Sequence, residues 1–256
     1  MIGEEADARL LASVTGKDAL GFLQGLVTND VLPLGRAPGL VWTGFLSPQG
    51  KYLADFFVVN TAETLLLDLP LLMAEDVLKR LGMYRLRADV QLTPQPGLHV
   101  TCGLGTAPDA GFADPRHPAL GWRHYGTAKG GPMRIDWQDL RVKHLIPEAN
   151  LELIPNESYI LEWGFERLHG VDFRKGCYVG QEVTARMKHK TELRKGIARI
   201  AVSRMVGIGA EITADGKAVG QVFTQSGGEA IAHLRFDRVT DDMMAGDAEV
   251  RFLGTA

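Results

Sequence analysis

The sequence predicts an α+β protein with a small all-β unit at its C-terminal end, and three observations carry this prediction. Helical hydrophobic patterns and a hairpin alternate along the first part of the chain. From about residue 195 the pattern changes to short alternating strands joined by tight turns. A chain of 256 residues can form one large domain or two moderate ones. We therefore expect a body over residues 1–192 and a small barrel or sandwich over residues 193–256.

The elements of the body follow from hydrophobic periodicity and from turn residues. The expected strands are 8–14, 40–47, 51–60, 64–69, 86–92, 98–104 and 119–124, and the expected helices are 18–27, 71–81, 156–168 and 181–190. The hairpin between the second and third strands turns at "PQG", where Pro48 fixes φ and Gly50 permits a positive φ. Gly82 and Gly170 are expected to end two of the helices.

The C-terminal strands are recognised by their turns. Asp215-Gly216 is a strong hairpin signal, because both residues tolerate the positive φ angles that a tight two-residue turn requires. The runs GKAVGQVF and EAIAHLRF that follow it alternate as half-buried strands do. These features leave a barrel and a sandwich open as alternatives.

Composition narrows the class of protein. A hydrophobic content of 45%, a charged content of 23% and a net charge of −3 are those of an ordinary globular protein without a basic field for nucleic acid or membrane lipid. The N-terminal residues lack the basic and then apolar pattern of a signal peptide, and Asp68 and Pro70 interrupt the most apolar stretch. Two cysteines exclude a four-cysteine metal site within one chain and indicate a reducing compartment. We expect a cytoplasmic protein without a membrane association.

Local charge is more informative than the total. Residues 174–195 contain seven Lys or Arg against two Glu, a local charge of +5, which leaves −8 for the remaining chain. A cationic segment on an acidic body indicates a small anion site or a docking surface for an acidic partner. The alternative is a solvated helix face followed by the start of a strand.

Cys177 lies within "RKGCYVGQE", between two glycines and next to two cations. The residues that follow Gly180 predict a helix, with Glu182 and Arg186 in the favourable i, i+4 order. A helix N-terminus and neighbouring cations favour an anion, so these residues predict an accessible thiolate at Cys177. The alternative from the residues alone is a buried cysteine in a turn between two elements.

The segment KGCYVGQE at 175–182 agrees with the motif KGCYxGQE of the YgfZ family at all seven specified positions. The chain resembles this family of folate-associated proteins, which are related to the glycine cleavage T-protein, over nearly its whole length. FLQGLVTNDV at 22–31 is similar to the family's N-terminal block and SPQGKYLADFFV at 47–58 to its hairpin. VDFRKGCYVGQEVTAR at 171–186 is the central match, and KGIARI begins the C-terminal barrel.

The resemblance implies a T-protein-like, folate-binding body followed by a small β-barrel. It implies a factor for assembly or repair of [4Fe–4S] proteins, including tRNA-modifying enzymes, in which the motif cysteine is central. The implied catalytic residues are Cys177 and Lys175. The residues implied to bind a cofactor are Tyr178, Gly180, Gln181, Glu182, Arg186, Asn29 and Asp55. The implied ligands are tetrahydrofolate and a transient iron–sulfur cluster shared with a partner.

Two positions depart from the T-protein pattern. The hairpin has Ala54-Asp55 where T-proteins have paired acids, so one carboxylate is missing. Lys143 stands where a glutamate holds the pterin ring in T-proteins, and an ammonium has no acceptor for the pterin N–H groups. "IPE" at 146–148 is similar to the mitochondrial iron–sulfur assembly branch of the family.

Three functions remain open from the sequence. The first is the maturation factor, with an iron–sulfur scaffold, a carrier protein or a client enzyme as partner and Cys177 as cluster ligand, electron relay or mixed-disulfide group. The second is a tetrahydrofolate-dependent one-carbon transferase that uses Lys51 and Asp55. The third is a docking scaffold without bound folate. The cationic segment suits the carboxylates of a polyglutamate folate tail and an acidic protein face equally well, whereas direct nucleic-acid binding is not expected.

Overall fold

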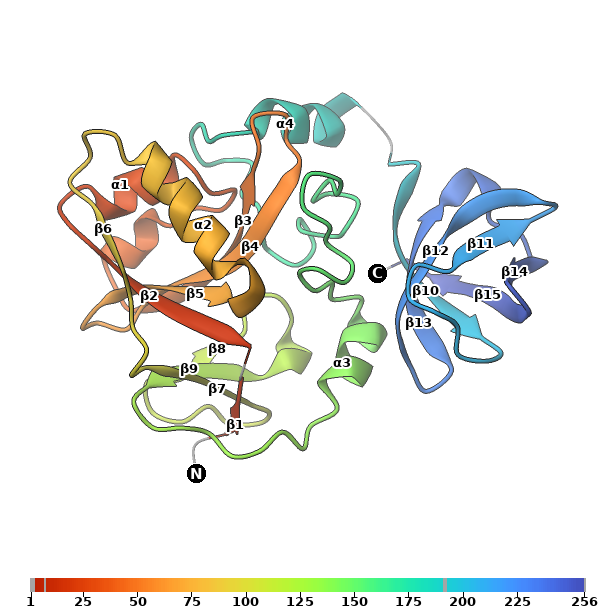
Figure 1. Cartoon of the computed structure of the whole chain (residues 1–256), viewed down its shortest axis with the longest axis horizontal. Coiled ribbons are helices and arrows are strands. Elements are labelled where there is room, and N and C mark those ends of the chain that lie inside the picture. Colours follow the sequence, from red (N-terminus) through yellow and green to blue (C-terminus); the bar gives the residue numbers. More distant parts are fainter. Residues whose placement is uncertain (1–2, 7, 191–192, 256) are drawn as a thin grey trace. The chain divides into compact units, whose positions relative to one another are not determined.

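The computed structural model describes residues 3–6, 8–190 and 193–255, and the chain forms two compact units. The first unit contains the residues up to Ile135 together with Glu166–Gln181. The second contains Asp136–Phe165 and the residues from Glu182 onward. Both units combine helices with antiparallel strands, which confirms the predicted α+β class (Figure 1).

The first unit is built on a five-stranded antiparallel sheet. Its strands, in the order β3-β4-β5-β2-β6, are β3 (Gly39–Leu46), β4 (Tyr52–Asn60), β5 (Leu65–Pro70), β2 (Arg9–Thr15) and β6 (Gln91–Pro94). The predicted β3–β4 hairpin is confirmed, and Gly50 has the expected positive φ of 74°. The apolar run Phe56–Val59 is buried on both sides of the sheet, as in a strand that is covered on each face.

A second sheet covers one face of the first. Its strands, in the order β1-β7-β9-β8, are β1 (Glu4–Glu5), β7 (His99–Gly103), β9 (Trp122–Gly126) and β8 (Phe112–Ala113). Arg123 and Tyr125 of β9 both donate hydrogen bonds to the carboxylate of Asp68 on β5. The two sheets therefore meet around a buried, charged hydrogen-bond cluster as well as around apolar side chains.

Helix α2 (Leu71–Tyr84) contacts β2 and β5, and α1 (Ala19–Gln24) and the 3-10 turns η1 (Leu32–Gly35) and η2 (Pro118–Leu120) complete the helical segments of this unit. The buried side chains of α2 are Met73, Ala74, Val77 and Leu81, close to the predicted stripe. The expectation that Gly82 ends this helix is wrong. The helix continues to Tyr84, whose ring packs edge-to-face on Phe45 with centroids 6.2 Å apart.

Two other expected elements differ in the structure. The strand expected at 86–92 begins only at Gln91, because Leu86 has a φ of 45° that a strand does not accommodate. The helix expected at 156–168 is a series of turns, since Asn156, Gly164 and His169 have φ values of 65°, 77° and 56°. The apolar residues of this segment are nevertheless buried, so their periodicity indicated burial and not helix.

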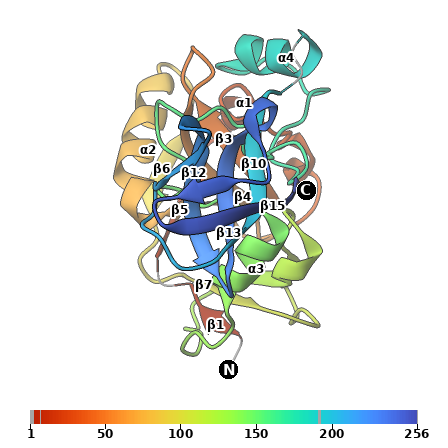
Figure 2. The ribbon, with the colours of Figure 1, turned by 90° about the vertical axis from the view of Figure 1, so that its right-hand side faces the viewer.

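The second unit contains helix α3 (Trp137–His144), helix α4 from Glu182 onward (Gln181–Lys190) and a closed barrel (Figure 2). The barrel strands, in the order β10-β13-β12-β11-β14-β15, are β10 (Lys195–Val202), β13 (Glu229–Arg235), β12 (Lys217–Ser226), β11 (Glu211–Ala214), β14 (Met243–Ala245) and β15 (Ala248–Gly254), with the 3-10 turn η3 (Phe236–Arg238) after β13. Because these strands form a closed sheet, the C-terminal strands form a barrel and not a sandwich. Asp215 and Gly216 form the predicted turn, with φ values of 48° and 71°.

Buried Glu152 ties the segment before the barrel to the barrel itself. Its side chain is fully buried and accepts hydrogen bonds from the backbone N–H and hydroxyl of Thr224 on β12. Arg141 of α3 donates to the other oxygen at 2.5 Å. Residues 136–165 therefore belong to the barrel unit, which the sequence had not indicated. The predicted boundary after residue 192 directly follows positions 191–192, which lie outside the described residues.

Candidate functional site

The segment that carries the cysteine motif is an irregular loop fixed at both ends to the turn after α1. The backbone N–H of Asp172 donates to the carbonyl of Thr28, and that of Val179 donates to the carbonyl of Gly25. Between them the chain has no regular secondary structure. Residues 173–178 are therefore held as a short loop between two anchors on the first unit.

Lys175 is the internal support of this loop. Its ammonium donates to the carbonyl oxygens of Gln24, Val27 and Asn29 at 2.8, 2.5 and 2.9 Å, and it lies 5.1 Å from the ring centre of Tyr178. The side chain is buried, and burial lowers the pKa of Lys175 to about 8. With its three protons directed at backbone carbonyls, the ammonium acts as a positioning group. The predicted catalytic role of Lys175 is not tested by this geometry.

Cys177 is exposed, which removes the alternative of a buried structural cysteine. The adjacent Tyr178 is buried, so the chain turns its aromatic side chain inward and its thiol outward. Helix α4 begins four residues later at Gln181, as the sequence predicted. The loop thus presents a thiol to solvent directly before a helix.

The two glycines of the motif have different roles. Gly180 has a φ of 84°, and a Cβ atom there would lie 2.5 Å from the carbonyl oxygen of Ser47 in the hairpin turn. The backbone of the β3–β4 hairpin therefore approaches this glycine closely. Gly176 has open space around it, since a Cβ atom added there would meet no atom within 4 Å. Only Gly180 is required by packing within the described residues.

Gln181, Glu182 and Arg186 lie on α4, and the predicted i, i+4 pair is present. Arg186 donates to Glu182 at 2.9 Å, and both side chains are largely exposed. Lys188 and His189 are also exposed on this helix. The side chain of Lys190, which the sequence places on the same polar face, lies outside the described residues. The exposed part of α4 is thus a cationic surface. Both a docking surface for an acidic partner and a simple solvated helix face predict this exposure.

Asn29 and Asp55 are joined through Trp42. The amide of Asn29 donates to the backbone carbonyl of Trp42 at 2.8 Å, and the Trp42 indole N–H donates to the carboxylate of Asp55 at 2.8 Å. The hydroxyl of Tyr52 donates to the other oxygen of Asp55 at 2.7 Å. Burial, and then the negative charge of Asp55, raise the pKa of Tyr52 well above its ordinary value. Asn29 and Lys175 meet through the Asn29 carbonyl, so Lys175, Asn29 and Asp55 belong to one network.

Sequence reasoning missed the second carboxylate cluster between the sheets. Asp68 is fully buried and accepts hydrogen bonds from Arg9 on β2 and from Arg123 on β9. The ring of Phe57 lies beneath the guanidinium groups of Arg9, Arg123 and Arg116, at 5.7, 4.3 and 5.0 Å from its centre. An aspartate within the apolar strand LLLDLP was the available signal, since a buried carboxylate requires a cationic partner.

Position 143 supplies an ammonium in place of the glutamate that holds the pterin ring in T-proteins. Lys143 lies on α3, and its ammonium pairs with Asp139 one helical turn away at 2.7 Å. Both oxygens of Asp55 already accept hydrogen bonds, and those of Glu152 do as well. Both carboxylates are thus held in place by donors of this chain itself.

Two kinds of feature are absent from the described residues. No group of three or more His, Cys, Asp or Glu side chains among them is arranged to hold a metal ion. No described helix has both the length and the apolar character needed to cross a membrane.

Comparison with solved structures defines the class of fold. The chain resembles the glycine cleavage system aminomethyltransferase T of Bartonella henselae with a TM-score of 0.72 over 99% of this chain and 86% of the other, at 13% identity. This confirms the predicted T-protein-like fold. Residues 194–253 match the family described as the CAF17 C-terminal β-barrel domain.

The sequence comparisons show the family. The chain is 30% identical to the mitochondrial iron–sulfur cluster assembly factor IBA57 of Mus musculus and of Homo sapiens, over 91% of this chain and 77% of each relative. It is 31% identical to the IBA57 homolog of Mycosarcoma maydis, over 75% of this chain and 55% of that protein. This chain belongs to the family of IBA57-type iron–sulfur cluster assembly factors, which confirms the predicted resemblance and supports a role in iron–sulfur cluster assembly.

The same relatives correct the expected location of the protein. The cysteine content and the N-terminal residues predict a cytoplasmic protein. The matched relatives are named mitochondrial proteins, which contradicts that prediction. Cysteine content and the absence of a secretory pattern do not distinguish the cytoplasm from the interior of mitochondria, because both compartments are reducing.

Proposed function

We propose that this protein assists the assembly or repair of [4Fe–4S] proteins, including tRNA-modifying enzymes, and that the thiolate of Cys177 is its reactive group. The observation that carries the proposal is the exposed Cys177 on a loop supported from within by Lys175. A thiol that must meet a second protein needs exposure, and a fixed backbone reduces the entropy lost when the two proteins bind.

The cluster is cargo in this proposal, and the partner must supply most of its ligands. Iron is bound by the thiolate and not by the thiol, so Cys177 would ligate the cluster in its deprotonated form. Cys177 can contribute a single bond to iron, whereas clusters of this kind take four cysteine or histidine ligands. A scaffold or carrier protein would therefore hold the cluster jointly with Cys177. The exposed cations Arg174, Arg186 and Lys188 favour an acidic face on that partner.

Tetrahydrofolate is a second element of the proposal, and it is supported by the fold alone. Position 143 provides an ammonium and not a carboxylate. The carboxylate of Asp55 accepts hydrogen bonds from Trp42 and Tyr52 of this chain. We therefore derive no step of cluster assembly through folate. A one-carbon transferase that uses Asp55 is the alternative function, favoured by the buried carboxylate on the family hairpin.

The assembly function is tested in cells that lack this protein and are supplied with the wild type, Cys177→Ala or Cys102→Ala. Cys102 is the matched control, since it is the other cysteine and is largely enclosed. We expect the wild type and Cys102→Ala to restore aconitase activity and tRNA methylthiolation, and Cys177→Ala to fail while folding normally. Restoration by Cys177→Ala would remove the thiol from the mechanism. Normal activity in cells without the protein would overturn the assembly function for these clients.

Folate binding is tested separately by calorimetric titration of the purified protein with tetrahydrofolate. Saturable binding that Asp55→Asn weakens, together with one-carbon turnover, would favour the transferase. Saturable binding without turnover would support folate as a ligand of the assembly factor. An absence of binding would remove folate from the proposal and leave the role of Cys177 unchanged.

A further inference from the structure

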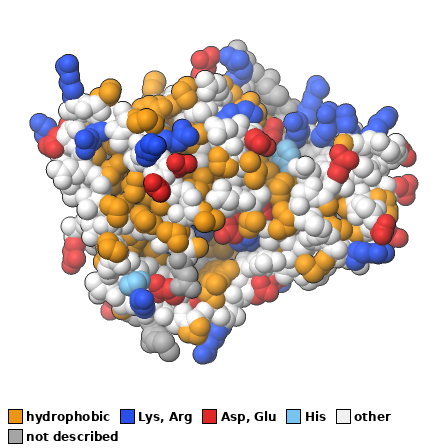
Figure 3. All heavy atoms as spheres, viewed as in Figure 1, with side chains coloured by type: hydrophobic (Ala, Val, Ile, Leu, Met, Phe, Trp, Pro, Cys, Tyr) orange, Lys and Arg blue, Asp and Glu red, His pale blue; other side chains and the backbone are white. Residues whose placement is uncertain are grey.

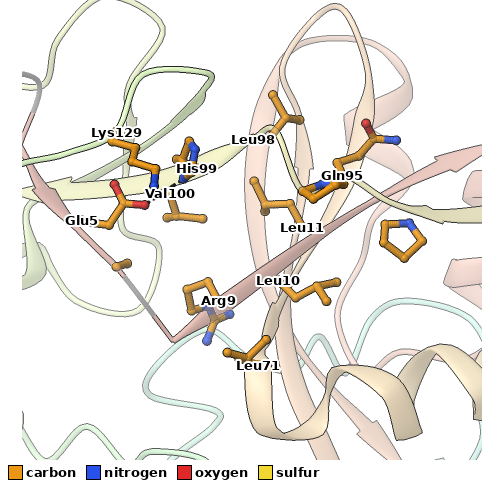
Figure 4. Close-up of a pocket in the computed structure, with 13 residues that line it drawn as sticks. Glu5, Arg9, Leu10, Leu11, Leu71, Gln95, Leu98, His99, Val100 and Lys129 are labelled. Carbon is orange, nitrogen blue, oxygen red and sulfur yellow. Dashed lines mark hydrogen bonds and ion pairs between the residues drawn. The ribbon is translucent and has the colours of Figure 1, made fainter.

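The first unit contains a cavity of about 350 Å³ that uses none of the residues of the cysteine site (Figure 4). It lies where the β2–β6 edge of the first sheet meets β1 and β7 of the second. Its volume is in the range of pockets for small organic ligands. Its walls differ in character, which limits the chemistry of a ligand.

One wall is polar and is held in place by Glu5. In Figure 4 Glu5, His99 and Lys129 lie together on this side. The Glu5 carboxylate pairs with His99 Nδ1 at 2.9 Å and accepts the backbone N–H of Gly130 at 2.6 Å. A Cβ atom on Gly130 would lie 2.4 Å from the backbone nitrogen of Glu5, so only glycine permits this approach. The contact fixes the loop that carries Lys129 at the rim.

Two cations face the cavity against this one carboxylate. Among the described residues, Lys129 forms no ion pair, and its side chain is exposed. Arg9 donates to Asp68 through Nε and Nη2, which leaves its Nη1 group without an acceptor in the described part of the chain. A guanidinium has five N–H donors, so Arg9 can bind a second acceptor while it keeps Asp68.

The facing wall is mostly apolar. Leu11, Leu98 and Gln95 lie on the side opposite Lys129 in Figure 4, and Leu10 and Leu71 lie near Arg9. Gln95 is itself fixed, because its amide donates to the hydroxyl of Ser13. The neighbouring Leu71 and Leu72 are 50% and 86% exposed, and hydrophobic side chains gather over α2 on this face (Figure 3).

We propose that this cavity binds a small carboxylate with an apolar body, such as an arylalkanoate or a branched-chain monocarboxylate. The carboxylate would be held by Lys129 and Arg9, and the apolar body would lie against Leu11 and Leu98. A neutral ligand would leave Lys129 unpaired, and a ligand with several charges would place a polar group against the leucines. The same chemistry occurs at the C-terminus of a peptide that ends in leucine, so two sources share this site.

The test is an NMR titration of the isotope-labelled full chain with 3-phenylpropionate and with its uncharged amide. We expect saturable shifts of the Gln95 and Val100 amides with the acid, and affinity lower by about tenfold for the amide, because hydrogen bonds to a charged group are the stronger ones. Lys129→Ala should weaken binding by about threefold, as expected for an exposed ion pair. Lys79→Ala, an exposed lysine on α2, is the matched control and should bind as the wild type does.

Leu98→Asp provides a second variant, since it places a carboxylate on the apolar wall and should abolish binding of the acid. Equal affinity of the acid and the amide, or unsaturable shifts in the wild type, would overturn the proposal. A capped tripeptide ending in leucine, as free acid and as amide, separates the two sources. Tighter binding of the peptide acid than of 3-phenylpropionate would identify a chain terminus, and the reverse would identify a metabolite.

Discussion

The ammonium of Lys175 lies 2.9 Å from the carbonyl oxygen of Asn29, although the two residues are 146 positions apart in the chain. The same ammonium donates to Gln24 and Val27, so one side chain joins the motif loop to the turn after α1. This arrangement explains why a lysine and a cysteine occur two residues apart in the motif. The lysine fixes the loop from within, and the cysteine is presented outside it.

Replacing Lys175 with methionine should destabilise the protein without changing its fold. The substitution leaves three carbonyl groups without their donor in a partly buried position, which should lower the free energy of unfolding by roughly 2–3 kcal/mol. Urea denaturation measures this change. Arg174→Met is the control, because the Arg174 side chain is 95% exposed and should leave the stability unchanged. Equal stabilities of the two variants would contradict the supporting role of Lys175.

The contribution of Lys175 should also depend on pH. Burial lowers its pKa from 10.5 to about 8, against the opposing effect of Asp30 and Asp172. Between these values the unfolded chain binds more protons than the native one, so the native state gains stability as pH rises. The difference in unfolding free energy between wild type and Lys175→Met should therefore increase from pH 8 to pH 10. A difference that stays constant or falls over this range would show that the native pKa is not lowered.

Gly180 should be irreplaceable, whereas Gly176 should tolerate alanine. Gly180→Ala forces a side chain into a positive φ and places its Cβ 2.5 Å from the Ser47 carbonyl oxygen. We expect a loss of roughly 1–3 kcal/mol from the backbone strain alone, with the contact adding to it. Thermal unfolding of both variants measures this, and Gly176→Ala should melt as the wild type does. A similar loss for both glycines would indicate that the loop is constrained in some other way.

Arg123 should be needed to keep Asp68 ionised. Burial alone would raise the pKa of Asp68. The guanidinium groups of Arg9 and Arg123 outweigh this effect and hold the pKa of Asp68 below its usual value. Its contribution to stability is thus complete above pH 4 and is lost as pH falls through the lowered native pKa. Arg123→Met should cost roughly 3–5 kcal/mol by leaving a buried charge half paired. Its acid unfolding should begin at a higher pH than that of the wild type, and coincident acid transitions would refute this.

The sequence predicted those parts of the fold that depend on local chemistry. The hairpin turn at Gly50, the Asp215-Gly216 turn and the helix after Gly180 each follow from residues whose backbone preferences act over a few positions. The helix expected at 156–168 failed because its apolar residues are spaced as in a helix but are buried by turns. A positive φ at Gly164 was compatible with the sequence, but hydrophobic periodicity alone does not reveal it.

The sequence motif identified the residues of the candidate site, but it did not predict the contacts that these residues make. Cys177 and Gly180 were identified from the motif, and their exposure and packing agree with an accessible thiol beside a close backbone contact. The acceptors of Lys175 could not be predicted, because they are backbone carbonyls some 146 to 151 residues away that have no side-chain signature. The partner of Asp55 was missed for a different reason, since the contact of the Trp42 indole with Asp55 depends on the register of the β3–β4 hairpin.

Asp55 distinguishes the two functions that the fold allows. Its carboxylate accepts hydrogen bonds from Trp42 Nε1 and from the Tyr52 hydroxyl, and asparagine would direct an N–H group at one of these donors. Asp55→Asn should therefore lower the free energy of unfolding by roughly 1–3 kcal/mol and shift the NMR signal of the Trp42 indole proton. Leu53→Ala, a partly buried position on the same strand, is the control for a general loss of packing. If the protein is an assembly factor that relies on Cys177, Asp55→Asn should restore aconitase activity in deficient cells at temperatures where it stays folded. A folded Asp55→Asn variant that fails to restore this activity would instead assign Asp55 a chemical role, as in the alternative transferase.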